Sequence, residues 1–215
     1  MDRILITGAL GQLGIEFIDH FKKLNSFVLA TDIKNPKEKL SCEFELANVL
    51  DKDKMDSLVK KYNINVIYHL VAILSANGEK DPFISWKLNM NSFQNIAQIS
   101  IENNIKKIFW PSSIAIFGTE SNLNFVSQNP LMNPTTIYGI TKLAGEKLME
   151  YYFNKFGLDI RSLRYPGIIS TKTVPGGGTT DYVIEMLNAA KKGNDYVCFL
   201  SENTELPMMY IDDAI

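Results

Sequence analysis

The sequence predicts a doubly wound α/β fold, in which helices cover both faces of a parallel sheet. Short apolar runs alternate along the chain with longer amphipathic segments. Strands that are separated by helices pair in parallel through right-handed crossovers. A glycine-rich turn joins the first strand to the first helix. We expect strands at 3–7, 26–31, 66–70, 107–110 and 159–164, and helices at 12–24, 52–62, 82–104 and 138–156.

The predicted helices have apolar residues on one face and capping residues at their N-termini. In the first of them, Leu13, Phe17 and Phe21 fall on one face. The third begins at Asp81-Pro82, a capping residue followed by a first-turn proline. These signals place the helices between the strands, as the doubly wound fold requires.

Composition limits the classes of function. The chain has 215 residues, 46% hydrophobic and 21% charged, with a net charge of −2. This is typical of an ordinary globular protein with one large domain, or one domain and part of a second. The charge favours neither nucleic acid nor an anionic membrane as a partner. Cys42 and Cys198 are far apart in sequence, so we expect no disulfide framework, no metal site and a cytoplasmic location.

The segment Gly8–Gly14 (GALGQLG) follows the first strand and opens the first helix. In that context the first glycine permits a tight turn, the second lets the backbone approach a pyrophosphate, and the third allows close packing of helix on sheet. The helix N-terminus then presents free N–H groups to phosphate. The alternative is a merely flexible turn, which the flanking strand and helix make the weaker interpretation.

Asp32 ends the second strand. A carboxylate there accepts hydrogen bonds from the adenosine ribose hydroxyls and repels a 2′-phosphate, which favours NAD over NADP. Lys34 lies close by in sequence and works against that preference. The alternative is that Asp32 only caps a loop.

Tyr138 and Lys142 are four residues apart on a predicted helix and therefore share a face. A free tyrosine has a pKa near ~10, too high for a base at neutral pH. We expect the ammonium to lower the pKa of the phenol, so that Tyr138 can take a proton from a substrate hydroxyl. Tyr and Lys share this spacing on many helices by chance, and the evidence here is their position after the glycine turn.

Ser112 and Ser113 end the strand that precedes this helix. Active sites of open α/β sheets lie beyond the carboxyl ends of the strands, where a serine can orient a reacting oxygen. The alternative is a helix cap or a turn serine.

The α/β rhythm ends after Tyr165. Pro166, Gly167, Pro175 and the run 176–178 interrupt it, and we expect a helix at 181–192 and a strand at 196–200. The final residues 212–215 have the pattern of a first helical turn, which predicts a longer, truncated protein. We therefore expect a nucleotide-binding domain at 1–165 and the start of a substrate-binding region at 166–215.

These motifs together resemble the extended short-chain dehydrogenase/reductases, a Rossmann-like family that includes nucleotide-sugar epimerases and dehydratases. The matches follow the family's order: Gly8-x-x-Gly11-x-x-Gly14, Asp32, His69-Leu70-Val71-Ala72, Asn89 and Asn95, Ser113 to Gly118, Tyr138-x-x-x-Lys142, and Arg164-Tyr165-Pro166-Gly167. Within the family, the strings at 73–82, 110–114, 165–170, 175–182 and 206–214 look most like short-chain-type L-threonine 3-dehydrogenases.

The resemblance implies NAD-dependent oxidation of L-threonine to 2-amino-3-oxobutanoate by a homodimer. It makes Tyr138 the base, Lys142 its partner and Ser113 the residue that holds the reacting hydroxyl. The implied substrate-binding residues are Ser75, Ser113, Tyr138, Gly178 and Thr179. The implied cofactor-binding residues are Gly8, Gly11, Gln12, Leu13, Gly14, Asp32, Asn48, Val49, Leu70, Val71, Ala72, Asn89, Tyr138, Lys142, Tyr165 and Pro166.

Some positions depart from the family pattern. Asn48 stands where an Asp is usual, and Val71 stands where a small residue is usual. From the residues themselves, we expect the amides of the glycine run 176–178 to bind a substrate carboxylate, the alternative being a simple linker.

Two other functions remain open. A nucleotide-sugar epimerase or dehydratase needs basic residues for the diphosphate, and residues 171–215 contain only Lys172, Lys191 and Lys192. A non-catalytic NAD-binding protein has no need of the Ser–Tyr–Lys set.

Overall fold

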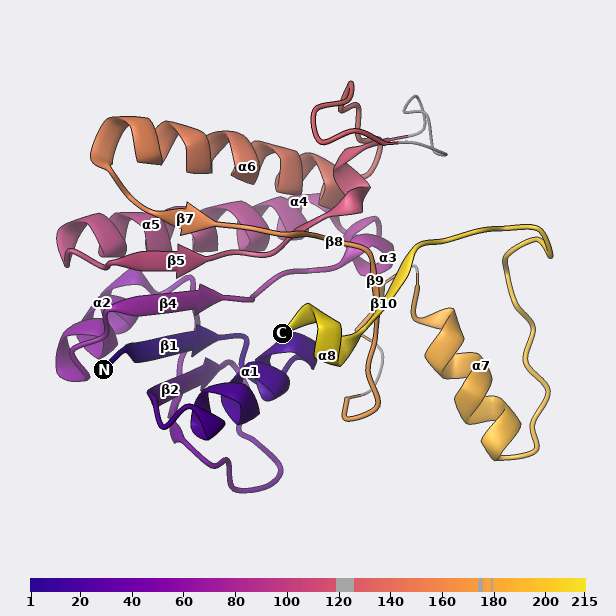
Figure 1. Ribbon diagram of the computed structural model, residues 1–215, viewed down its shortest axis with the longest axis horizontal. Helices are drawn as coiled ribbons and strands as arrows, with labels where there is room; N and C mark the ends of the chain where they lie inside the picture. Colours follow the sequence, from indigo (N-terminus) through magenta and orange to yellow (C-terminus); the bar gives the residue numbers. More distant parts are fainter. Residues whose placement is uncertain (119–125, 174–175, 179) are drawn as a thin grey trace.

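The computed structural model describes residues 1–118, 126–173, 176–178 and 180–215. Its centre is a parallel six-stranded sheet with the order β3-β2-β1-β4-β5-β7 (Figure 1). The strands are β1 (Arg3–Thr7), β2 (Phe27–Asp32), β3 (Glu43–Leu46), β4 (Val66–His69), β5 (Lys107–Phe109) and β7 (Ile160–Arg161). The predicted doubly wound α/β fold is confirmed.

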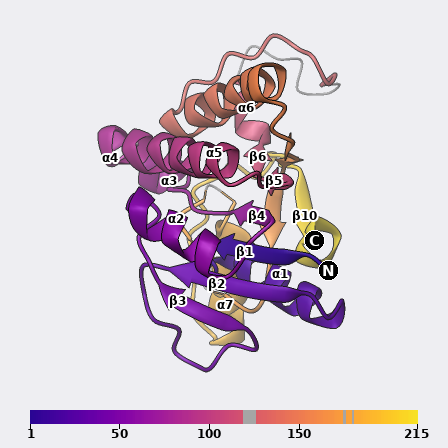
Figure 2. The same ribbon diagram turned by 90° about the vertical axis from the view of Figure 1, so that its left-hand side faces the viewer.

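Helices cover both faces of this sheet (Figure 2). The surrounding helices are α1 (Gln12–Lys23), α2 (Lys52–Lys61), α5 (Ser92–Glu102) and α6 (Ile137–Phe156). In β1, Leu5 packs into one apolar cluster with α2 and α5, whereas Ile4 and Ile6 pack into another with α1. Successive side chains of a strand point to opposite faces, so a strand buried on both sides is apolar throughout.

The expected helix at 82–104 is one helical run with a change of pitch. It consists of α4 (Pro82–Trp86), a π-helical segment (Lys87–Asn91) and α5. The side chain of Asp81 accepts a hydrogen bond from the amide of Ile84 at 2.9 Å, as the capping signal predicts. The wide turn places Asn89 in the interior, where it is 2% exposed.

Residues at the carboxyl edge of the sheet form two short parallel pairs. β6 (Ser112–Ser113) pairs with β8 (Arg164–Tyr165), and β9 (Gly167–Ile169) pairs with β10 (Met208–Tyr210). The predicted strand at 159–164 is therefore split between β7 and β8. The helical turn α3 (Ser75–Gly78) and the 3₁₀ turn Ile114–Ile116 complete this edge.

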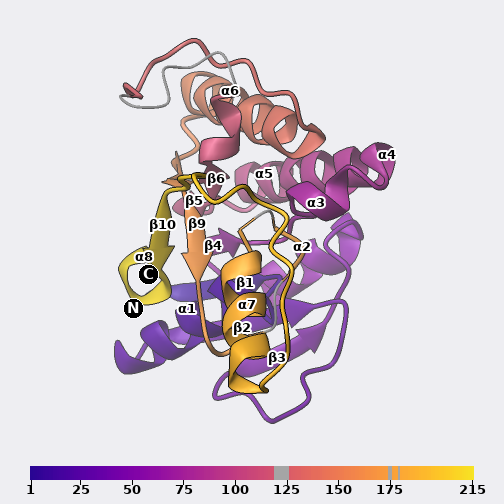
Figure 3. The ribbon, with the colours of Figure 1, turned by 90° about the vertical axis from the view of Figure 1, so that its right-hand side faces the viewer.

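The C-terminal part differs most from expectation. The helix α7 (Tyr182–Lys191) and the last turn α8 (Ile211–Ala214) are present, but residues 196–200 form no strand. That prediction is wrong because no neighbouring strand pairs with this exposed segment, in which Val197 is 90% exposed. Figure 1 shows α7 apart from the main sheet, on the side of β9 and β10, and Figure 3 shows the molecule from that side. The domain boundary at residue 165 stays a prediction.

Within the described residues, no helix is both long and apolar enough to cross a membrane.

Candidate active site

A cavity of about 720 Å³ opens where β1, β4 and β5 end. It is bounded by the glycine turn after β1, the start of α6, and the β9–β10 pair. Most of the predicted site residues line it: Gly8, Gly11, Gln12, Leu13, Gly14, Leu70, Ala72, Ser75, Ser113, Tyr138, Lys142, Tyr165, Pro166 and Gly178. The carboxyl edge of the sheet therefore gathers residues that are up to 170 positions apart (178 − 8 = 170) in the chain.

The glycine turn has the shape that a dinucleotide requires. Gly8 has a φ of 67°, a conformation that L side chains rarely adopt. A Cβ on Gly14 would lie 2.5 Å from the carbonyl oxygen of Ala9, so only glycine permits this approach of α1 to the turn. Gly11 occupies the N-cap of α1 and has no side chain to cap it. The first amides of the helix thus face the cavity and suit a pyrophosphate.

Asp32 holds this turn in place. Its Oδ2 accepts a hydrogen bond from the amide of Leu10 at 3.1 Å, and its Oδ1 accepts one from the amide of Lys34 at 3.3 Å. Asp32 therefore caps the loop, as the alternative interpretation of this residue predicted. A carboxylate has about four acceptor positions, so a ribose hydroxyl could still bind the same group.

The first two turns of α6 carry the Tyr–Lys pair. Thr136 caps the helix by accepting a hydrogen bond from the amide of Gly139 at 3.1 Å. The ammonium of Lys142 donates to the carbonyl oxygen of Pro111 at 2.5 Å and lies 4.2 Å from the centre of the Trp110 ring. It lies 5.5 Å from the centre of the Tyr138 ring.

Burial dominates the acid–base properties of this pair. Burial raises the pKa of Tyr138 to about 12. A hydrogen bond with Ser113 lowers this pKa, but by less than burial raises it. Burial also lowers the pKa of Lys142 to about 7. The predicted lowering of the Tyr138 pKa by Lys142 is therefore wrong for the chain alone. The loss of solvation outweighs other effects, and the ammonium is directed to Pro111.

Ser113 has two polar contacts, one within its own turn and one with Tyr138. Its Oγ accepts a hydrogen bond from the amide of Ala115 at 3.2 Å, which is the turn-serine alternative. The same side chain hydrogen-bonds the hydroxyl of Tyr138. Ser113 therefore stands between the end of β6 and the phenol, inside the cavity.

Asn89 lies behind the cavity rather than in its lining. Its Oδ1 accepts from the amide of Ile73 at 2.8 Å, and its Nδ2 donates to the carbonyl of Ile73 at 3.1 Å and to Oγ1 of Thr141 at 3.3 Å. Thr141 in turn donates to the carbonyl oxygen of Tyr138 at 2.8 Å. Asn89 thus connects the loop after β4 to α6, and its amide has partners other than a cofactor.

Asp32 and three further predicted cofactor residues also lie outside the lining. Asn48 uses its Oδ1 to accept from the amide of Leu50 at 3.0 Å. Val49 is 3% exposed and packs in the core. Val71 packs against Gly8, since a Cβ on that glycine would lie 3.1 Å from the Val71 Cγ2.

The glycine run 176–178 binds an internal carboxylate. The amides of Gly177 and Gly178 donate to Oδ2 of Asp181 at 2.7 and 2.8 Å. The expectation that these amides bind a substrate carboxylate is therefore wrong for this arrangement, because Asp181 occupies them. Thr179, the other predicted substrate contact, lies outside the described residues.

Asp181 itself lines the cavity, and sequence reasoning missed it. The available signal was its position directly before α7, where an acidic residue suggests only a helix cap. Its carboxylate nevertheless places a negative group in the lining, which suits an ammonium ligand.

His69 has a structural position at the end of β4. Its ring nitrogens lie 2.7 Å from Oγ1 of Thr7 and 3.0 Å from Oγ of Ser92. Burial and the charge of Lys142 lower its pKa to about 3, so the ring is neutral. In the described part of the chain, no three His, Cys, Asp or Glu side chains cluster as a metal site would require.

Comparison with known proteins adds to this geometry. The family model of the NAD dependent epimerase/dehydratase family matches residues 4–215. An uncharacterized epimerase/dehydratase of Staphylococcus haemolyticus is 41% identical over the whole chain, which covers 69% of that relative. One from Staphylococcus saprophyticus is 42% identical over the whole chain, which covers 68% of it.

Solved structures agree with the family match. The holo form of a GalE-like L-threonine dehydrogenase from Cupriavidus necator superimposes with a TM-score of 0.94 at 42% identity, covering 99% of this chain and 70% of that one. L-threonine dehydrogenase from Clostridium difficile has a TM-score of 0.93 at 42% identity, covering 100% and 68%. A Thermus thermophilus UDP-glucose 4-epimerase in complex with NAD has a TM-score of 0.89 at 19% identity, which shows the fold alone; it covers 99% and 71%.

The parallel sheet and glycine turn define a dinucleotide-binding class of α/β protein. Within that class, the chain belongs to the NAD dependent epimerase/dehydratase family. Its cofactor is NAD, as the sequence predicted.

Proposed function

We propose that the protein oxidises L-threonine to 2-amino-3-oxobutanoate with NAD as the electron acceptor. The carrying observation is that Ser113, Tyr138 and Lys142 meet in one cavity that begins at the glycine turn. Solved L-threonine dehydrogenases at 42% identity support this substrate.

Ser113, Tyr138 and Lys142 have different roles in this reaction. Ser113 holds the β-hydroxyl of the substrate, and Tyr138 takes the proton from that hydroxyl. Bound NAD supplies the hydride acceptor and a positive charge that favours the phenolate. Lys142 adds its own positive charge when protonated, and both charges oppose the effect of burial on Tyr138.

Three groups of residues would hold NAD. The first amides of α1, at Gln12 and Leu13, bind the pyrophosphate where Gly8, Gly11 and Gly14 allow its approach. Asp32 binds the adenosine ribose. Leu70, Ala72, Tyr165 and Pro166 line the nicotinamide end of the cavity. Asn48, Val49, Val71 and Asn89 act on the cofactor only through the loops that they support.

The charges in the cavity suit a small zwitterion. Among the described lining residues, Lys142 and Asp181 are the charged ones. We propose that Asp181 attracts the ammonium group of the amino acid, while Ser75 provides a polar contact. Thr179 remains a proposed substrate contact.

A nucleotide-sugar epimerase or dehydratase is the second candidate, and the names of the Staphylococcus relatives favour it. A sugar nucleotide carries a diphosphate, for which the described lining offers a single cation, Lys142. This charge balance makes the amino acid the better substrate. A non-catalytic NAD-binding protein is the third candidate. The buried Tyr–Lys pair makes it the weakest, because such a protein needs no base.

The test is NADH formation by the purified full-length protein with NAD and L-threonine. We expect turnover that L-serine supports much more weakly, because serine lacks the methyl group beside the hydroxyl. Conversion of UDP-glucose without NADH formation from L-threonine would replace the first candidate by the second. NAD binding without turnover of either substrate would leave the non-catalytic role.

A further inference from the structure

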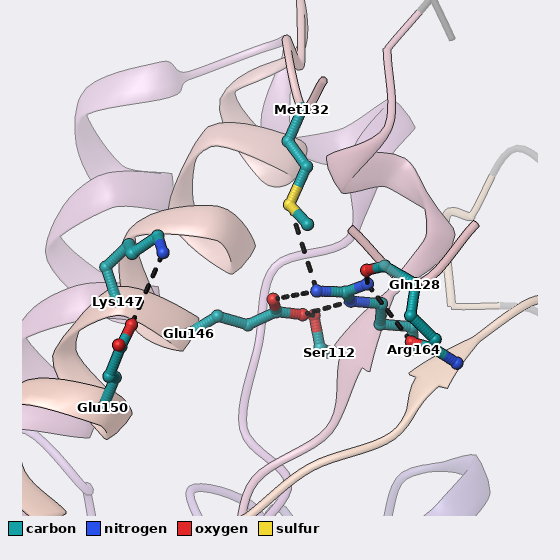
Figure 4. A network of polar contacts seen from close by, with 7 residues as sticks. All are labelled: Ser112, Gln128, Met132, Glu146, Lys147, Glu150 and Arg164. Atoms are coloured by element: carbon teal, nitrogen blue, oxygen red, sulfur yellow. Dashed lines mark hydrogen bonds and ion pairs between the residues drawn. The ribbon is translucent and has the colours of Figure 1, made fainter. Parts of the chain in front are cut away.

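A partly buried ion pair joins Glu146 to Arg164 beside Ser112, the residue before Ser113 (Figure 4). Glu146 stands on α6 eight residues after Tyr138 and four after Lys142, so the three side chains follow one stripe of the helix. Arg164 reaches it from β8 and donates from Nε to Oε1 at 3.0 Å and from Nη2 to Oε2 at 2.8 Å. Their side chains are 22% and 17% exposed for Arg164 and Glu146. This geometry is the strong bidentate form of the interaction.

Glu146 also holds Ser112. The hydroxyl of Ser112 donates to Oε1 of Glu146 at 2.6 Å, and Ser112 is 2% exposed. Ser112 and Arg164 face each other in the β6–β8 pair, in which Ser113 faces Tyr165. One carboxylate therefore binds both members of the residue pair that precedes Ser113 and Tyr165.

β6 is a short strand outside the main sheet. β6 and β8 have two residues each and stand apart from the six-stranded sheet. The carboxyl group of Glu146 is ionised, because hydrogen bonds from Arg164 and Ser112 bring its pKa below the usual range although burial raises it. The Glu146 cluster holds β6 together with the backbone bond from the amide of Ser112 to the carbonyl of Leu163 at 2.9 Å and the bond from Lys142 to Pro111.

We propose that Glu146, paired with Arg164, is a positioning residue that sets the hydroxyl of Ser113 against the hydroxyl of Tyr138. Its effect passes through Ser112, the neighbour of Ser113 on β6. The inference rests on the proposed function of the Ser–Tyr–Lys site. It adds a role for a side chain that touches neither substrate nor cofactor.

The test compares Glu146→Gln with Glu150→Gln. Glu150 lies one turn further along α6 in an exposed pair with Lys147, with side chains 66% and 74% exposed, so it matches in chemistry and helix position (Figure 4). We expect Glu146→Gln to lower kcat for L-threonine by about tenfold or more with a small change in KM, since misplacement of a reacting group acts on the chemical step. Glu150→Gln should leave both unchanged.

A double-mutant cycle separates positioning from general stability. In a Ser113→Ala background, Glu146→Gln should lower kcat by less than about twofold, because the group it positions is already gone. An undiminished loss in that background overturns the proposal, and so does an unchanged kcat in the single variant. Should Glu146→Gln fail to fold, Ser112→Ala takes its place, since it removes the link to Glu146 and spares the ion pair.

Hydrogen exchange provides a readout without substrate. The amide of Ala115 donates to Ser113 Oγ, so its exchange reports on the position of that serine. We expect the amides of residues 112–117 to exchange faster in Glu146→Gln than in the wild type, and at the wild-type rate in Glu150→Gln. Unchanged exchange in Glu146→Gln contradicts the proposal. This measurement remains decisive if the wild type does not oxidise L-threonine, an outcome that contradicts only the proposed function.

Discussion

The ammonium of Lys142 donates a 2.5 Å hydrogen bond to the carbonyl oxygen of Pro111, the residue directly before Ser112 and Ser113. The catalytic helix and the end of the β5 strand are thereby joined through the same lysine that faces Tyr138. This bond explains why the ammonium stands 5.5 Å from the centre of the phenol ring. Lys142 is thus a structural as well as a chemical member of the site.

Replacing the proposed base should stop turnover and spare the cofactor site. Tyr138→Phe removes the hydroxyl that accepts the proton and changes little volume. We expect the rate of L-threonine oxidation to fall by about 10²–10⁴-fold, the usual contribution of a positioned general base. The Kd for NAD, measured by calorimetry, should change by less than about threefold. Activity near the wild-type level would remove Tyr138 from the mechanism.

The burial of Lys142 predicts a pH-dependent stability. Its pKa is about 7 in the folded protein, below the ordinary value of 10.5. Between these values the unfolded chain binds more protons, so this group makes the protein more stable as the pH rises, and its cost is largest below pH 7. Lys142→Met removes this dependence.

The Tm of Lys142→Met minus that of the wild type should therefore be highest at acidic pH and fall as the pH rises through the range 7 to 10.5. The upper limit is about 1.4 kcal/mol per unit of pKa difference, and the lost bond to Pro111 reduces it. Thermal unfolding across this pH range is the measurement. A Tm difference that stays constant would show that Lys142 titrates normally.

Asp32 predicts the choice of cofactor. Asp32→Ala removes the proposed ribose contact and the acceptor for the Leu10 amide. Hydrogen bonds to a charged group contribute about 1.5–3 kcal/mol, so the Kd for NAD should rise by about 10- to 100-fold. The wild type should bind NAD more tightly than NADP, and the variant should lose that preference. Lys34→Ala should strengthen the preference for NAD, and equal affinity of the wild type for both cofactors would contradict the role of Asp32.

Gly14 tests the close packing of α1 on the glycine turn. A Cβ there would lie 2.5 Å from the carbonyl oxygen of Ala9, whereas one on Gly11 meets its nearest atom at 3.2 Å. Gly14→Ala should therefore cost about 1–3 kcal/mol, a decrease in Tm of about 2–12 °C for a chain of this size. Gly11→Ala should lower the Tm less. Equal Tm values for both variants would show that the turn adapts to a side chain.

Exposed apolar side chains on α4 and α6 predict a homodimer. Phe83 on α4 is 86% exposed and Phe153 on α6 is 61% exposed, and large apolar surfaces of this kind mark association sites. Light scattering should give the mass of a dimer, and Phe83→Asp with Phe153→Asp should give a monomer. Val197→Asp, at a position 90% exposed outside both helices, is the control. A monomeric wild type would contradict this prediction.

The sequence by itself determined the alternation of the main strands and helices, although not β3, and it determined the glycine turn and the Tyr138–Lys142 spacing. These features depend on residues within a few positions of one another, such as Gly8 with Gly14 or Asp81 with Pro82, so local periodicity and capping reveal them. Only the tertiary structure decided how Tyr138 titrates, that Asp181 occupies the amides of Gly177 and Gly178, and that β9 pairs with β10. Desolvation and pairing depend on which distant segments pack together, and no local pattern encodes the atoms that will surround a buried side chain.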